Sequence, residues 1–208
     1  MLELKLNQTV SNIKEAIFEL LNNKEIVYTI KSNNLAVAPT KFEIFENEKK
    51  KYSLAYTNED LKAIITSVKH PLNVFTLYDK EKKEIGKFYR KKSKLFFGYY
   101  FFVLEYHDKI YKMYEVGMGK EGIKLPIYSE DEQVALIEKN IVTIDNKDTY
   151  NVKISNKNII DVSLIMGLYY DSLRFGHRGE VSKDKTNYNY LISINKELIS
   201  KYDKNWGK

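Results

Sequence analysis

The 208-residue chain has no cysteine and only 3 prolines and 9 glycines. Without cysteine, a disulfide framework, a thiolate nucleophile and a cysteine-ligated zinc site are all excluded. The N-terminus, MLELKLNQTV, lacks the long apolar core of a secretion signal, so we expect a cytoplasmic protein. Because proline and glycine are scattered and no linker is evident, we expect one domain over residues 1–208.

Histidine is scarce as well. His70, His107 and His177 are far apart, and none has a second histidine two or four residues away. Metal ligation or a catalytic triad would require them to converge in space, so we interpret them as exposed turn histidines. The sequence therefore predicts no metal site and no cofactor.

Two carboxylates lie within the most apolar stretch, residues 159–176, but their spacing does not suit acid–base catalysis. On a helix, Asp161 and Asp171 would be about 15 Å apart, too far for a glycosidase pair. We interpret Asp161 as a helix cap and Asp171 as an ion-pair partner of Arg174. No catalytic residue is predicted, and we do not expect an enzyme.

Aromatic residues are abundant, and 17 tyrosines and 10 phenylalanines favour strands over helices. From residue 25 to 155 the chain alternates apolar and polar positions in a repeated hairpin pattern. The repeat is clearest in four segments: 42–56, 75–89, 102–116 and 125–139. Their irregular spacing indicates an antiparallel meander, and closing the sheet removes its exposed edges. The pattern predicts a mainly β closed barrel of about twelve strands, one of them at 61–69.

Near the N-terminus the apolar period differs. Ile13, Ile17, Leu20 and Leu21 recur at i, i+4, i+7 and i+8, behind residues that cap helices well. We predict a short amphipathic helix over 12–23.

The stretch 159–176 is too short to span a bilayer, since only nine residues separate Asp161 from Asp171. Projected as a helix, it is apolar over more than half of its circumference, so it must be enclosed. We predict a central helix over 159–175 inside the barrel, where Gly167 allows one wall to approach closely. Beyond it, 177–208 forms a C-terminal extension with an expected strand at 188–195.

Hairpins such as FEIFENEKKKYSLAY and FTLYDKEKKEIGKFY, followed by the helix pattern IIDVSLIMGLYYD, resemble the tubby C-terminal-like superfamily. The resemblance covers about 25–175, and the most similar members are the LURP-one-related proteins, their bacterial relatives, and the phospholipid scramblases. It implies the barrel around a helix, and tubby-like relatives recognise phosphoinositide headgroups. The scramblases are associated with calcium, but 145–161 has only three carboxylates, too loosely spaced to bind it.

Most of the net charge of +6 is local, because residues 79–94 hold eight basic and three acidic residues. A basic patch attracts phosphate on lipid or on nucleic acid, and a solvated, charged strand edge is the alternative. We rank nucleic acid below lipid. The aromatic residues of 95–102 could likewise insert at a membrane interface, stack on nucleic acid, or face the core. The candidate residues for an anionic headgroup are Lys87, Arg90, Lys91, Lys92 and Lys94.

These observations together predict a non-enzymatic binding protein that engages anionic phospholipid at the membrane surface, as a peripheral cytoplasmic protein. The alternative is a structural or protein-interaction module that binds a partner or a second copy through 177–208.

Overall fold

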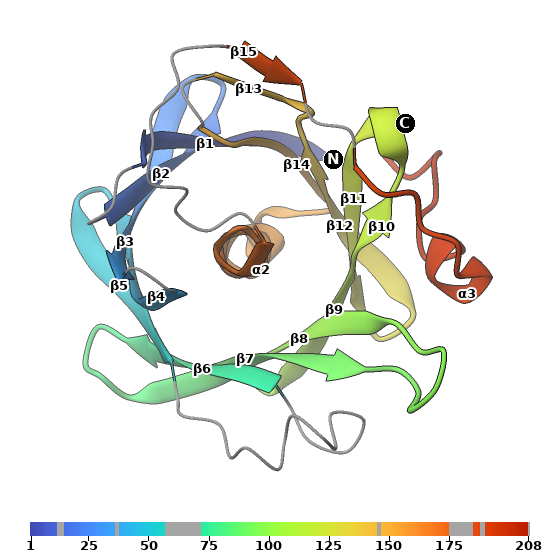
Figure 1. The fold of residues 1–208 in the computed structure, drawn as a ribbon. Helices are drawn as coiled ribbons and strands as arrows, with labels where there is room; N and C mark the ends of the chain where they lie inside the picture. Colours follow the sequence, from blue (N-terminus) through green and yellow to red (C-terminus); the bar gives the residue numbers. More distant parts are fainter. Residues whose placement is uncertain are drawn as a thin grey trace.

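The computed structural model describes residues 1–11, 15–35, 38–56, 72–144, 147–174, 185–187 and 190–207. Its main feature is a closed antiparallel barrel of twelve strands around one helix, as the sequence predicts (Figure 1). The predicted strand at 61–69 lies outside the described residues.

Each barrel strand pairs with the next along the chain from β1 to β9, and β9 then pairs with β11. The ring closes through β11, β12 and β14, because β14 pairs with β1. The strands are β1 (Leu2–Ser11), β2 (Glu15–Asn22), β3 (Glu25–Leu35), β4 (Ala38–Glu46), β5 (Lys49–Tyr56), β6 (Leu72–Asp79), β7 (Glu84–Lys92), β8 (Tyr100–Tyr106), β9 (Lys109–Tyr114), β11 (Ile123–Ser129), β12 (Glu132–Lys139) and β14 (Thr149–Ile154).

Three short strands lie outside this ring. Strand β10 (Val116–Gly117) pairs with β11, beside the 3-10 helix η1 (Gly119–Glu121). Strand β13 (Val142–Ile144) pairs with β15 (Lys185–Asn187) in a separate sheet. The expected strand at 188–195 is not present among residues 190–195, which form only an isolated bridge between Met118 and Ile192.

The prediction of an N-terminal helix over 12–23 is wrong, because β2 occupies Glu15–Asn22. Ala16, Phe18 and Leu20 are buried at every second position, so a different set of apolar residues, which shares only Leu20 with the helical stripe, fits a strand period. Short apolar runs are ambiguous between the two periods. Here the strand is favoured because β2 lies between β1 and β3 in the ring and pairs with the backbone hydrogen-bonding groups of both strands.

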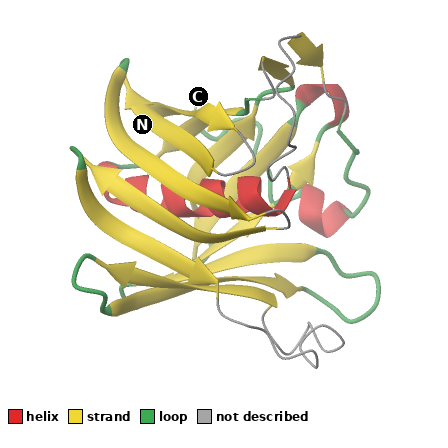
Figure 2. Ribbon diagram, turned by 60° about the vertical axis from the view of Figure 1, so that its left-hand side comes forward, coloured by secondary structure: helices red, strands yellow, loops and turns green. Residues whose placement is uncertain are grey.

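The helix α2 (Ile160–Arg174), preceded by the 3-10 turn η2 (Lys157–Ile159), runs through the barrel (Figure 2). The ring of Tyr169 packs against those of Phe75 and Phe88, with ring centres 5.2 and 4.0 Å away. A side chain at Gly167 would come within 3.2 Å of Ile137, so this glycine lets the wall approach the helix. The prediction of an enclosed helix is confirmed.

The C-terminal extension packs against the outside of the barrel wall, where the short helix α3 (Lys196–Ile199) lies (Figure 1). Leu198 is buried against Tyr114 and Val116. The Trp206 indole donates a hydrogen bond to the Gln133 carbonyl at 3.0 Å. The described part of this segment therefore covers its own barrel.

The two ends of the barrel differ. At the end where α2 begins, three hairpins turn in two residues with positive φ at both positions, which matches the twist of paired strands. We call this the tight-turn end, and the opposite end, where α2 terminates and β7 connects to β8, the loop end. The three turns are Asn23–Lys24, Asn47–Glu48 and His107–Asp108.

Candidate functional site

The predicted basic residues of β7 are divided between the two faces of the strand. Phe88 is fully buried inside the barrel. Because side chains alternate along a strand, Arg90 and Lys92 share its inner face, toward the loop end. Lys87 and Lys91 point to the outside.

Arg90 and Lys92 converge on a single aromatic ring. The Arg90 guanidinium carbon lies 4.5 Å from the centre of the Tyr100 ring, and the Lys92 ammonium lies 5.8 Å from it. Tyr100 is the cross-strand partner of Lys92. The Arg90 Nε is buried and has no hydrogen-bond partner in the described part of the chain. Both cations thus lie over a π face, and neither forms an ion pair with a carboxylate in the part of the chain that the structure describes.

One carboxylate lies close to this group. Glu197 of α3 accepts a hydrogen bond from Lys94 at 2.9 Å, which lowers the pKa of Glu197. Lys91 and Lys92 form no ion pair with any described residue, so four cations face one carboxylate. We call these four the basic cluster: Arg90, Lys91, Lys92 and Lys94.

Lys87 is not part of the basic cluster. It lies about 10 Å from Arg90 along the strand by the usual rise. It forms an ion pair with Glu84 at 3.3 Å, and it is paired across the sheet with Glu105. Two carboxylates therefore offset its charge.

The connection from β7 to β8 presents three apolar side chains to solvent. Ser93 and Tyr99 close it through two hydrogen bonds, and a side chain at Gly98 would collide with the Lys94 backbone. The interpretation that aromatic residues here face the core holds for β8, where Phe102 is buried, but not for this connection. We call its exposed residues the apolar loop: Leu95, Phe96 and Phe97.

Sequence reasoning missed a second group of exposed apolar residues beside this loop. Leu191, Ile192 and Ile194 are exposed on the C-terminal extension. The Asn195 side chain donates a hydrogen bond to the Phe97 carbonyl at 3.4 Å, which links the two segments. For the apolar loop a signal was available, since its run LFF breaks the alternation expected of a half-buried strand.

The two carboxylates of α2 were also candidates for chemistry. Asp161 accepts hydrogen bonds from the hydroxyls of Tyr28 and Tyr52, each at 2.8 Å, and from Tyr106 at 3.4 Å. Its other neighbour is Lys51, at 3.2 Å. Burial and the nearby Asp161 raise the pKa of all three tyrosines, that of Tyr106 to about 12. These contacts tie the start of the helix to three strands of the wall.

Asp171 does not pair with Arg174 as expected, because Arg174 forms its ion pair with Glu115 at 2.6 Å. Asp171 is instead buried and accepts a hydrogen bond from the Tyr150 hydroxyl. Burial and the neighbouring Asp148 raise the pKa of Asp171 to about 7, although nearby Lys139 opposes the shift.

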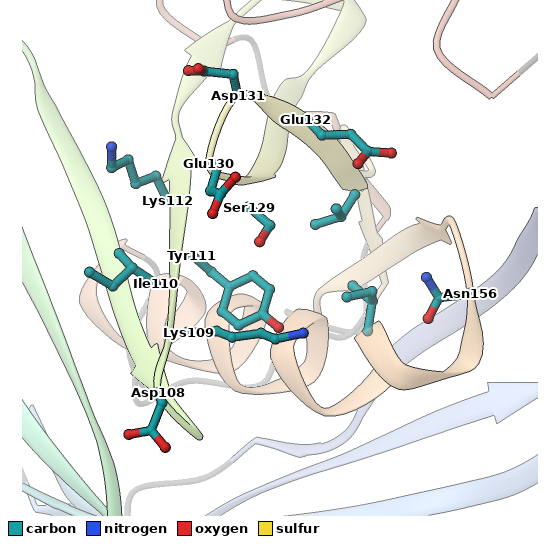
Figure 3. A pocket seen from close by; sticks show the side chains of 12 residues that line it. Asp108, Lys109, Ile110, Tyr111, Lys112, Ser129, Glu130, Asp131, Glu132 and Asn156 are labelled. Atoms are coloured by element: carbon teal, nitrogen blue, oxygen red, sulfur yellow. The ribbon is translucent and has the colours of Figure 1, made fainter.

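A hollow of about 1030 Å³ lies at the tight-turn end (Figure 3). The Tyr111 side chain lies in front of the helix in this view, and the side chains of Lys112 and Asp131 both point toward its left side. No group of three histidines or carboxylates that could hold a metal is found among the described residues. His107 is exposed in its turn, while His70 and His177 lie outside the described residues. The absence of an enzymatic activity stays a prediction.

Comparisons of the chain with models of protein families, with curated proteins and with solved structures found no match. Among the described residues, no helix has the length and apolarity required to cross a membrane.

Proposed function

We propose that this is a non-enzymatic, peripheral membrane protein of the cytoplasm that binds anionic phospholipid headgroups through the basic cluster at the loop end. We also infer that the chain is a tubby-like protein, related to the LURP-one-related proteins and phospholipid scramblases. The closed barrel of twelve strands around a hydrophobic helix is compatible with that fold. Headgroup recognition by tubby-like proteins agrees with the sign of the cluster.

One observation carries the proposal: four cations gather at one end of the barrel, and only Lys94 has a carboxylate partner within the described chain. Arg90 and Lys92 are fixed over Tyr100, which reduces the conformational entropy lost on binding a phosphate. Each basic residue near an anionic surface contributes about 1 kcal/mol. Lys87 is left out because two carboxylates already flank it.

The test is co-sedimentation with vesicles of phosphatidylcholine alone and of phosphatidylcholine with phosphatidylserine. The variant carries Lys91→Ser, Lys92→Ser and Lys94→Ser, and Arg90 is kept because it packs on Tyr100. We expect its affinity for anionic vesicles at low salt to fall on the order of 100-fold, because three lysines together contribute about 3 kcal/mol. Binding of the unsubstituted protein, the parent, should also weaken as salt rises, because exposed charges are screened.

The matched control removes the same charge from the tight-turn end through Lys49→Ser, Lys80→Ser and Lys109→Ser, all at exposed positions. It should bind nearly as well as the parent. Equal losses in both variants would mean that net charge alone drives binding, and no loss in the first variant would refute the proposal.

The alternative is a protein-interaction module that uses the C-terminal extension. The exposed Leu191, Ile192 and Ile194 favour it. If it is correct, the parent should leave vesicles unbound, and Leu191→Ser with Ile194→Ser should change the oligomeric state or the partners that the protein retains.

A further inference from the structure

We infer that the apolar loop inserts into the boundary between headgroups and acyl chains, while the basic cluster binds the headgroups around it. This inference rests on the proposed function and adds a second, hydrophobic mode of binding to the same end of the barrel. It follows from the exposure, the backbone and the charged surroundings of Leu95, Phe96 and Phe97.

Exposure is the first observation. Phe97 is 98% exposed and Phe96 is 76% exposed, at the tip of a connection between two strands. Adjacent phenylalanines are rarely left in water in a folded protein, where large exposed apolar patches indicate interaction sites. The neighbouring Ile194, 92% exposed, extends the apolar surface on the side of the C-terminal extension.

The backbone of Phe97 is the second observation. Its φ is +55°, in the left-handed region that bulky side chains seldom adopt. At the other exposed turns with positive φ, the residues are polar, as at Asn47 and Asp108. Phe97 therefore disfavours folding in two ways: its backbone is in a strained conformation, and its ring is exposed to water. Such strain is typical of residues held in place for function.

The surrounding charge identifies a lipid surface as the occupant. Lys92 donates a hydrogen bond to the Leu95 carbonyl at 2.9 Å, so an ammonium group lies at the base of the apolar loop. Lys91 and Lys94 lie on either side of Lys92 in the sequence. Aromatic and aliphatic side chains next to lysines form the combination that enters the interface of anionic membranes. A second copy of the chain would bring the same cations together, which disfavours self-association.

The absence of cysteine makes the experiment direct, because one introduced cysteine can be labelled uniquely. Phe97→Cys carries an environment-sensitive fluorophore, and Asp108→Cys in the tight-turn end is the matched control. Both are mixed with phosphatidylcholine–phosphatidylserine vesicles that contain lipids with nitroxide quenchers at shallow or deep positions on the acyl chain. We expect quenching at position 97, strongest with the shallow quencher, and none at position 108.

An unlabelled variant gives a second readout. Phe96→Ser with Phe97→Ser should lower binding at high salt, where electrostatic attraction is screened, by on the order of tenfold for each ring. Its binding at low salt should still respond to Lys91→Ser and Lys92→Ser. Both side chains are exposed, so thermal unfolding should change little.

The outcomes separate the two proposals. If the parent binds anionic vesicles and the label at position 97 is not quenched, insertion is wrong and headgroup binding stands. If the parent binds no vesicles, both are wrong. If sedimentation velocity without lipid shows a dimer that Phe97→Ser dissociates, the apolar loop is a contact between copies and insertion is refuted.

Discussion

The tight-turn end and the loop end of the barrel differ in how their charged and apolar side chains are partnered. At the tight-turn end, Asp161 is surrounded by three hydroxyls and an ammonium group, and the connections are short and polar. At the loop end, Lys91 and Lys92 form no ion pair within the described residues, and phenylalanine is exposed. One end is therefore organised for stability. The other end presents cations with no ion-pair partner among the described residues, beside exposed apolar side chains.

The helix itself carries this contrast. Asp161 at its start has several donors, whereas Asp171 near its end has the Tyr150 hydroxyl and lies close to a second carboxylate, Asp148. Desolvation of a carboxylate favours its neutral form unless donors or cations compensate. Burial and Asp148 thus raise the pKa of Asp171, whereas Asp161 is surrounded by hydroxyl donors and a cation.

The largest expected effect comes from Asp171. Its pKa rises from 3.8 to about 7 on folding, so the folded chain binds this proton more tightly than the unfolded chain. This contribution to stability is fully present below about pH 4 and is lost as the pH rises to about 7, by up to about 4 kcal/mol. Asp171→Asn keeps an acceptor for Tyr150 and should remove this pH dependence.

Urea unfolding of parent and variant between pH 4 and pH 8 measures this difference. Asp171→Asn should be the more stable protein at pH 8 and nearly equal to the parent at pH 4. An unchanged pH dependence in the variant would show that a group other than Asp171 causes it.

A smaller effect is expected from Asp161→Ala, which should lower the free energy of unfolding by about 3 kcal/mol. The hydroxyls of Tyr28 and Tyr52 would lose a charged acceptor, and Glu46 would be the remaining ionic partner of Lys51 among the described residues. Chemical denaturation checks the value. Lys91→Ala at the loop end is the comparison, with an expected change below about 0.5 kcal/mol. Similar losses in both variants would remove the contrast between the ends.

The smallest effect sharpens the comparison. Glu48 has a φ of +64° in a two-residue turn that prefers glycine, so Glu48→Gly should stabilise the protein by about 0.5 to 1 kcal/mol. Phe97→Gly at the loop end should relieve similar strain. Thermal unfolding should rise in both, but vesicle binding should fall only in Phe97→Gly. A loss of stability in Phe97→Gly would show that the ring contributes to the fold.

Most of the barrel is predictable because its strands alternate clearly and its turns are polar, as in 42–56 and 75–89. The central helix is equally clear, since an element that is apolar all round has only one place in a closed sheet. The N-terminal strands were not predicted, for a physical reason. Ile17 and Leu20 fit a helical stripe, and only the pairing of β2 with β1 and β3 decides between the helical and the strand period.

The candidate site was less predictable. Charge density along the sequence identified the basic segment, but not that Lys87 is flanked by Glu84 and Glu105 while Arg90 packs on Tyr100. Those contacts depend on strand register. Glu197 lies more than a hundred residues from Lys94 in the sequence, and only the docking of α3 brings them together.

The pairing of β1 with β14 has a consequence for how the chain reaches its fold. Strand β1 finds one of its two partners only after Ile154 has been made, and the helix that fills the barrel follows later still. Contacts of such long sequence separation make folding slow. The apolar inner faces of the preceding strands are covered only once α2 is present, so we expect productive folding of the barrel to begin only after α2 has been synthesised.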